Sequence, residues 1–177
     1  MFQKESITVD FMIRKLRDRV EVAVESVNAI DADREVTESN LHRPGLALAG
    51  YVDLFTFQRV QILGNTEHRY LRHLDPTEQE QAFRNITQFD LPCVIGTDGN
   101  ELPGRLVDLA TNAGIPVYRT ELPTVEFMAS LRAFLEDQFA PQCSVHGSLV
   151  DVYGIGLLLI GKPGIGKSEV ALDLVER

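Results

Sequence analysis

The sequence is poor in several residue types, and each shortage narrows the class of protein. Its 177 residues include no tryptophan and two cysteines. Cys93 and Cys143 lie far apart, without a C-x-x-C motif or flanking histidines, so both are predicted to be reduced thiols rather than a disulfide or a metal site. No apolar run approaches the roughly 18 residues of a membrane span, and the N-terminus lacks the apolar stretch of a signal peptide. We therefore expect no membrane association and a location in the cytoplasm.

Positive charge is also scarce. Lysine and arginine number 17 against 26 aspartates and glutamates, which gives a formal net charge of −9 and a pI near 4.9. A general nucleic-acid binder would need a basic surface, so nucleic acid is not expected as a partner. The hydrophobic content of 44% and the charged content of 24% are ordinary for a globular protein.

The clearest motif lies near the C-terminus, where residues 161–168 form the pattern G-x-x-x-x-G-K-S. Residues 157–160 are predicted to be a buried strand entering this loop, and residues 169–176 a helix leaving it. This is the context of a phosphate-binding loop, although a glycine turn that matches by accident is the simpler alternative. The predicted phosphate-binding residues are Gly161, Lys162, Pro163, Gly164, Ile165, Gly166, Lys167 and Ser168.

The chemistry of such a loop follows from its composition. Glycines let the backbone wrap around an anion with its N–H groups pointing inward, and the helix N-terminus adds partial positive charge. Lys167 is predicted to reach the β- and γ-phosphates, and the Ser168 hydroxyl to bind Mg²⁺. The cofactors expected from the motif are therefore ATP and Mg²⁺.

A nucleotide site of this kind also needs an acidic Mg²⁺ partner, usually on a later strand. One strand and one short helix cannot cover both faces of a parallel sheet. We therefore expect the chain to be the front part of a longer protein, with a first domain over residues 1–136 and the start of a second over residues 137–177. On this interpretation the chain alone would be inactive.

The first domain is predicted to be α/β, because strand and helix patterns alternate from residue 59 to residue 138. The expected helices cover residues 6–17, 39–41, 75–87, 102–113 and 123–138, and the expected strands cover residues 21–26, 59–64, 93–96 and 115–119.

Other candidate site residues carry weaker signals. His146 falls on a strand expected to form a hairpin with the strand before the loop, which would bring its imidazole near a transferred phosphate; a packing or surface histidine is the alternative. Asp151 is a possible metal ligand or a solvated acid. His42, His68 and His73 are predicted to lie at the surface, and Arg43-Pro44-Gly45 to form a turn rather than an anion site.

Several segments together resemble the HPr kinase/phosphorylase family. The strongest runs from Val145 to Leu157 (VHGSLVDVYGIGL) and leads directly into the phosphate loop. The others are residues 43–46 (RPGL), 61–64 (QILG), 114–117 (GIPV) and 122–127 (LPTVEF).

This resemblance implies a fold and an activity. The family phosphorylates a serine of the small phosphocarrier protein HPr with ATP, and reverses this by attack of inorganic phosphate, which gives pyrophosphate. The first domain would resemble that of the Mur ligases, the second would resemble phosphoenolpyruvate carboxykinase, and the enzyme would be a homohexamer. His146 and Lys167 would be active-site residues.

One residue departs from the family pattern, because Pro163 stands where a small polar residue is usual and removes a backbone N–H. Two other functions are compatible with the sequence. One is a phosphate-loop kinase acting on a small molecule, and the other is a non-catalytic regulatory or assembly module built on residues 1–136.

Overall fold

A computed structural model describes residues 3–19 and 24–175. The chain divides into two compact units, one spanning Lys4–Ala140 and the other beginning at Pro141. Both contain strands and a helix, so the predicted α/β class is confirmed. No helix in the described ranges is both long and apolar enough to cross a membrane.

The first unit contains a five-stranded sheet in the order β2-β7-β6-β5-β4. Strands β4 to β7 are parallel, and β2 pairs antiparallel with β7 at one edge. A short antiparallel pair, β1 with β3, lies apart from this sheet. The strands are β1 (Ile7–Thr8), β2 (Val24–Ser26), β3 (Glu35–Val36), β4 (Leu41–His42), β5 (Val60–Leu63), β6 (Val94–Gly96) and β7 (Val117–Thr120).

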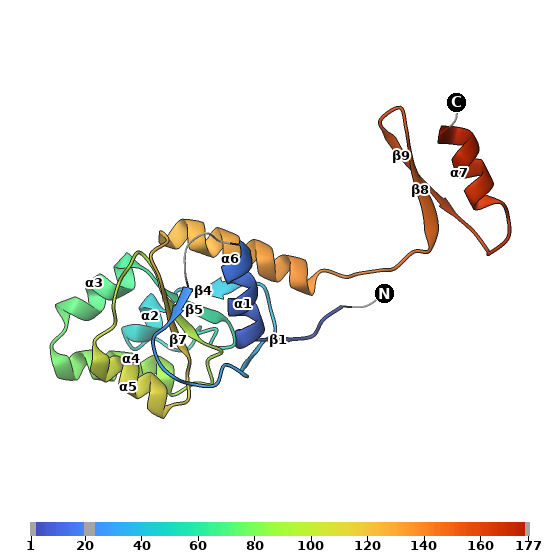
Figure 1. Ribbon diagram of the computed structural model, residues 1–177. Coiled ribbons are helices and arrows are strands. Elements are labelled where there is room, and N and C mark those ends of the chain that lie inside the picture. Colours follow the sequence, from blue (N-terminus) through green and yellow to red (C-terminus); the bar gives the residue numbers. More distant parts are fainter. Residues whose placement is uncertain (1–2, 20–23, 176–177) are drawn as a thin grey trace. The chain divides into compact units, whose positions relative to one another are not determined.

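Helices cover both faces of this sheet (Figure 1). Successive side chains of a strand point to opposite faces, so Ile95 packs with one apolar cluster and Val94 with the other. The first cluster is closed by α1 and α6, and the second by α2, α3, α4 and α5. These helices are α1 (Val9–Arg19), α2 (Gly45–Leu48), α3 (Asn65–His73), α4 (Pro76–Thr87), α5 (Gly104–Asn112) and α6 (Thr124–Phe139).

Local sequence explains where the clearest helices begin. At the start of α4 the Asp75 carboxylate accepts hydrogen bonds from the backbone N–H groups of Thr77 (2.8 Å) and Glu78 (2.9 Å), and the Glu78 carboxylate accepts one from the backbone N–H of Asp75. This is a capping box, followed by Pro76 at the first helical position. The predicted helix start is confirmed.

Several sequence predictions in this unit need correction. The helix expected over residues 6–17 begins later, because Ile7–Thr8 is strand β1 and α1 starts at Val9. The short helix expected over residues 39–41 is wrong, because Leu41 begins strand β4. No helix is expected between the strand that ends at residue 64 and the helix that starts at residue 75, so α3 is an element that the sequence did not predict. In the structure Glu67 accepts a hydrogen bond from the backbone N–H of Gly64 (3.0 Å) and so caps the first turn of a helix. Of the strand expected over residues 21–26, residues 21–23 lie outside the described ranges, and Val24–Ser26 is β2.

The second unit is an antiparallel hairpin followed by a helix. Its elements are β8 (Gly147–Val152), β9 (Ile155–Ile160) and α7 (Lys167–Val175). The strand predicted over residues 157–160 is confirmed as part of β9, and the helix predicted over residues 169–176 is confirmed as far as Val175, since residue 176 lies outside the described ranges. The predicted burial of that strand is not found, because Leu158 and Ile160 are 48% and 61% exposed. Among the described residues, no second layer covers this face of the hairpin.

Candidate functional site

The predicted phosphate loop connects β9 to α7. It begins at Gly161, directly after the last residue of β9, and ends at Lys167, the first residue of α7. Gly164 and Gly166 have φ angles of 83° and 85°, in the left-handed region that glycine adopts without a steric penalty. The strand, the glycine loop and the helix therefore follow one another in the order that an anion site at a helix N-terminus requires.

Lys167 is folded back over this loop. Its ammonium group donates hydrogen bonds to the carbonyl oxygens of Gly161 and Lys162, each at 2.9 Å. A neutral carbonyl is a weaker partner for an ammonium group than a phosphate oxygen is. The amine is thus held at the loop by contacts that an anion could replace.

Three loop residues, Gly161, Pro163 and Ser168, have clear structural settings. A side chain at position 161 would overlap Ile165, because a Cβ built on Gly161 would lie 2.2 Å from the Ile165 Cδ1 atom. Ser168 lies in the first turn of α7 and is exposed, so its hydroxyl is accessible. Pro163, at the top of the loop, has no N–H to offer an anion.

His146 precedes β8 and is exposed. The hairpin register places Gly147 opposite Ile160. His146 and Gly161 therefore leave the same end of the hairpin, one from each strand. The hairpin was predicted from the sequence, and it brings the histidine backbone to the entrance of the loop, although the strand begins one residue after His146.

Asp151 lies toward the opposite end of the hairpin, where it pairs with Gly156. Its Oδ1 atom accepts a hydrogen bond from the backbone N–H of Gly154 (2.9 Å) and so shapes the turn between the strands. Tyr153 and Gly154 both have positive φ angles in this turn. The structure separates Asp151 from the loop along the length of the hairpin, which favours the solvated acid over the metal ligand. Within residues 3–19 and 24–175, no group of three or more histidine, cysteine or acidic side chains is placed to hold a metal ion.

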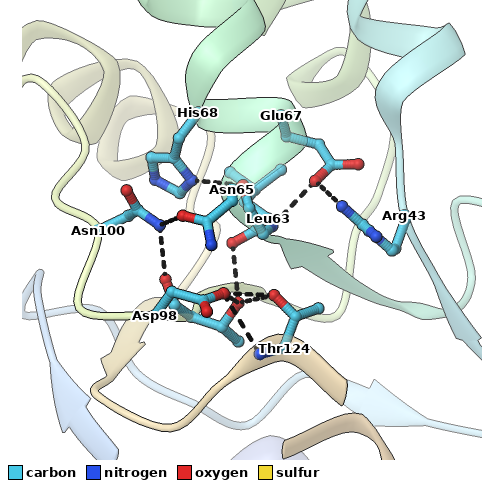
Figure 2. A network of polar contacts seen from close by, with 10 residues as sticks. Arg43, Leu63, Asn65, Glu67, His68, Asp98, Asn100 and Thr124 are labelled. Atoms are coloured by element: carbon cyan, nitrogen blue, oxygen red, sulfur yellow. Dashed lines mark hydrogen bonds and ion pairs between the residues drawn. The ribbon is translucent and has the colours of Figure 1, made fainter.

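A second polar site, which the sequence did not predict, lies at the carboxyl ends of β5 and β6 (Figure 2). Glu67 is 4% exposed and accepts hydrogen bonds from the Arg43 guanidinium (2.6 Å) and the backbone N–H of Gly64. Arg43 follows β4 and Glu67 follows β5, so the ion pair joins two segments that are distant in sequence. Arg43-Pro44-Gly45, expected as a turn, instead leads into α2.

Asp98 forms the other half of this polar network. Its carboxylate accepts hydrogen bonds from the hydroxyl (2.5 Å) and backbone N–H (3.3 Å) of Thr124, and from the Thr97 hydroxyl (3.2 Å). The Thr124 hydroxyl, followed by the other hydrogen bonds, holds the pKa of the Asp98 carboxyl below its usual range. Asp98 therefore fixes the start of α6 to the end of β6.

The predicted surface position of His68 is wrong, because the structure buries its side chain to 2% exposure. Its Nδ1 atom lies 3.0 Å from the carbonyl oxygen of Gly64. Burial is the main cause that lowers the pKa of His68 below its usual value, and the neighbouring Arg72 adds to this. His42 is half-buried, and His73 is exposed as predicted.

One signal could have indicated this network. Arg43, Gly64 and Thr97 each come directly after a strand, and the carboxyl ends of neighbouring parallel strands lie at one edge of a sheet. That placement depends on strand β4, which contains only two residues, and the first of these, Leu41, falls in the short helix expected over residues 39–41.

A groove of about 440 Å³ lies over β7, between β2 and α5. Arg119 on its floor donates to Glu25 (2.8 Å) and to Glu101, so one guanidinium joins the edge strand to the loop before α5. Val27, Leu102 and Val107 add apolar surface to the walls. The groove has both polar and apolar lining but no nucleophile paired with a base.

Known families match both units. Residues 7–135 match the family model described as HPr Serine kinase N terminus, and residues 137–177 match the one described as HPr Serine kinase C-terminal domain. The HPr kinase/phosphorylase of Chloroherpeton thalassium is 49% identical over 176 residues, which cover 99% of this chain and 52% of that protein. The HPr kinase/phosphorylase of Pelodictyon phaeoclathratiforme is also 49% identical over 176 residues, covering 99% and 53%. The chain thus spans about half the length of these curated relatives.

Among solved structures, the CBS and DRTGG domains of the regulatory region of Clostridium perfringens pyrophosphatase match 76% of this chain and 47% of that one. The sequence identity is 16% and the TM-score is 0.47. At this TM-score the likeness carries no argument about function.

Proposed function

Because this chain belongs to the HPr serine kinase family, we propose that the protein is a bifunctional HPr kinase/phosphorylase. In the kinase direction a serine hydroxyl of HPr takes the γ-phosphoryl group of ATP, loses its proton and releases ADP. In the phosphorylase direction inorganic phosphate takes the phosphoryl group from phosphoserine, which gives pyrophosphate and the free serine. The observation that supports this proposal best is the glycine loop between β9 and α7, with His146 at its entrance.

The residues of the loop fit a nucleotide phosphate. Positive φ angles at Gly164 and Gly166 allow a backbone curve that a Cβ would strain, and the N-terminus of α7 follows directly. We propose residues Gly161 to Ser168 as the binding site of ATP. When bound, ATP with Mg²⁺ supplies the phosphoryl group and neutralises part of the charge on its oxygens.

Lys167 is proposed to change partners when an anion enters the loop. Its ammonium group now donates to two neutral carbonyl oxygens, which an anionic oxygen can displace. In that position it would neutralise charge on the transferring group. The Ser168 hydroxyl, exposed in the first turn of α7, is proposed as the Mg²⁺ ligand from this chain.

His146 is proposed to act beside the same phosphate. The hairpin holds its backbone opposite the entrance of the loop, and an imidazole changes charge near neutral pH. A protonated His146 would attract inorganic phosphate and favour dephosphorylation. A neutral His146 could accept a proton instead.

For the protein as a whole, we propose a cytoplasmic homohexamer whose partners are HPr, inorganic phosphate and pyrophosphate, without nucleic acid or membrane. Residues 1–136 would then be a regulatory or assembly domain related in fold to the first domain of Mur ligases. Residues 137–177 would begin an ATP-binding domain related to phosphoenolpyruvate carboxykinase.

Phosphoryl transfer in Lys167→Ala tests the assignment of the loop. In a protein of the relatives' length that contains this chain, we expect transfer from ATP to HPr to fall by about 100-fold or more, as when one charge-stabilising donor is removed. Lys15→Ala is the control, since it removes an exposed lysine from α1 in the other unit. Turnover in Lys167→Ala equal to that of the control would overturn the assignment.

The substrate is tested separately. Incubation with ATP and either HPr or a panel of phosphorylatable metabolites, with an HPr variant lacking its acceptor serine as control, distinguishes an HPr kinase from a small-molecule kinase. Phosphorylation of a metabolite but not of HPr would show the second. Absence of any transfer, with the Lys4–Ala140 unit folded and oligomeric, would favour the regulatory or assembly module.

His146→Ala tests the histidine. We expect it to change the pH dependence of the balance between phosphorylation of HPr and phosphate-dependent dephosphorylation, because the group proposed to change charge is gone. His73→Ala, which removes an exposed histidine from the other unit, is the control. Profiles identical to wild type in both directions would make His146 a surface residue.

A further inference from the structure

His68 has a buried nitrogen atom with an unsatisfied hydrogen-bonding capacity. Its Nδ1 atom faces the Gly64 carbonyl oxygen at 3.0 Å, and since a carbonyl only accepts, Nδ1 must carry the proton. In the neutral ring, Nε2 is then an acceptor. No hydrogen-bond donor reaches Nε2 from the described residues, although the side chain is 98% buried. An acceptor that is buried without a partner is costly, and native structures rarely leave one so.

The same ring lines a small pocket of about 50 Å³. This volume exceeds what one water molecule needs, and it is well below the roughly 300 Å³ of the smallest drug-sized pockets. The lining residues are His68, Leu71, Arg72, Gln79, Glu101 and Pro103. The cavity lies between α3, α4 and the loop that connects β6 to α5.

The polar groups around this cavity specify the chemistry of its occupant. Nε2 of His68 requires a donor. Arg72 offers guanidinium donors and Glu101 offers carboxylate acceptors, although each already has one partner, Asn100 and Arg119 respectively. An occupant that both donates and accepts satisfies this lining, and an O–H group is the smallest that does so.

A second buried group without a partner belongs to the same cluster. The guanidinium of Arg105 donates to Gln79, which lines the cavity, and its Nε–H has no acceptor within the described ranges. Arg105 does not line the pocket itself, but its contact with Gln79 places this unpaired donor next to the pocket lining. Water bridges unpaired donors and acceptors in protein interiors.

We propose that this cavity is a buried hydration site, in which a water molecule donates a hydrogen bond to Nε2 of His68. The water would connect α3 to the loop between β6 and α5, beside His68, which Figure 2 shows next to the polar network. Glu101 also lines the 440 Å³ groove on the other side of that loop. The hydration site would therefore support the wall of the groove from within.

The charged groups near His68 agree with a neutral ring. The positive charge of Arg72 on α3 opposes a second proton on the His68 ring. The carboxylates of Glu67 on α3 and Asp98 beyond β6 favour that proton, but burial of the ring opposes it more strongly. Arg105 on α5 and Glu101 before it are the remaining charges, and each already has a partner. The ring therefore stays an acceptor at neutral pH.

A crystal structure of the whole chain that resolves ordered water tests this proposal. We expect a water oxygen at hydrogen-bond distance, about 2.7 to 3.2 Å, from Nε2 of His68. A long-range ¹H–¹⁵N spectrum should show the proton on Nδ1, with a water cross-peak to the His68 ring. An empty cavity, a proton on Nε2, or a direct bond from Nε2 to a protein group would each overturn the proposal.

Substitutions provide a second readout. His68→Phe removes the acceptor and should abolish the water cross-peak and the density, whereas His73→Phe on the exposed side of α3 should leave both unchanged. If His68→Phe does not fold, Gln79→Leu alters the lining while keeping His68, and the water should then become weaker in density or exchange faster. An unchanged water in folded His68→Phe, or in Gln79→Leu where only that variant folds, would overturn the proposal.

Discussion

The two units of this chain form their secondary structure equally well but differ in what covers it. In the Lys4–Ala140 unit the strand residues Val60 and Ile62 are fully buried beneath α1 and α6. In the other unit Leu149 and Leu158, which face each other across the hairpin, are 73% and 48% exposed. Hydrogen bonds along a ladder and apolar side chains are thus sufficient to form strands, but a core requires a second layer. The stability of the described chain should therefore reside in the first unit, while the residues proposed for chemistry lie in the second.

The largest effect expected from this difference is that of a core truncation. Phe127→Ala empties a fully buried site on α6 and should lower the free energy of unfolding by about 3 to 5 kcal/mol. Val125→Ala, on the same helix but 80% exposed, is the matched control and should change it by less than about 0.5 kcal/mol. Chemical denaturation followed by far-UV circular dichroism measures both. Equal effects would mean that α6 does not hold the core together.

The next effect compares an ion pair with one buried partner, Glu67, with a pair whose two side chains are both exposed. Glu67→Gln removes the charge that faces Arg43 and weakens the cap of α3, and we expect a loss of about 1 to 3 kcal/mol. Glu136→Gln breaks an exposed pair with Arg132 one helical turn away, for which about 0.5 kcal/mol or less is expected. The same denaturation experiment compares them. A larger loss in the exposed pair would contradict the role assigned to burial.

The pH dependence of stability should identify His68. Its pKa is lowered in the folded protein, so below the ordinary value of about 6.5 the unfolded chain binds a proton more readily than the folded one. Stability is then fully present above about pH 6.5 and falls as the pH drops toward the lowered pKa. The pKa of His42 is also lowered, by burial and by the positive charge of Arg59, so His42 contributes to the same loss of stability at low pH. The decrease in the free energy of unfolding between about pH 7 and 5 should be smaller in His68→Phe than in wild type and unchanged in His73→Phe. An equal decrease in His68→Phe and wild type would contradict the role assigned to His68.

The smallest effect is expected in the hairpin. Leu149→Ser changes an apolar residue that is already largely in water, and should alter the free energy of unfolding of this chain by less than about 0.5 kcal/mol. Hydrogen exchange resolved by peptide should show the β8–β9 amides exchanging faster than those of β5 and β6 in wild type and variant alike. Slow exchange in the hairpin, together with a large effect of Leu149→Ser on the free energy of unfolding, would contradict the inference that stability resides in the first unit.

What could be predicted from the sequence was local in origin. The start of α4 follows from Asp75, Pro76 and Glu78, and the buried face of α6 follows from the spacing of Phe127 and Leu131. The glycine loop and the hairpin before it are also contained in short runs of sequence. Each of these features depends on residues within one or two turns of one another.

What could not be predicted depends on distant contacts. His68 stands among charged residues on α3, and only the packing of α4 and the loop after β6 buries it. Glu67 is buried because Arg43 pairs with it from 24 positions away. Strand β4 has only two residues, and its conformation is fixed by pairing with β5 rather than by its own composition. The polar site at the sheet edge could not be predicted because it combines the buried His68, the Glu67–Arg43 pair and strand β4.

The hairpin register determines which changes of length the proposed phosphate site could survive during evolution. Deletion of the last pair before the turn, Val152 and Ile155, would shorten the ladder by one rung and leave His146 across from Gly161. Deletion of one residue from a single strand would instead shift every rung and turn its side chains to the other face. Insertions and deletions should therefore be tolerated in matched pairs at the turn and selected against within either strand.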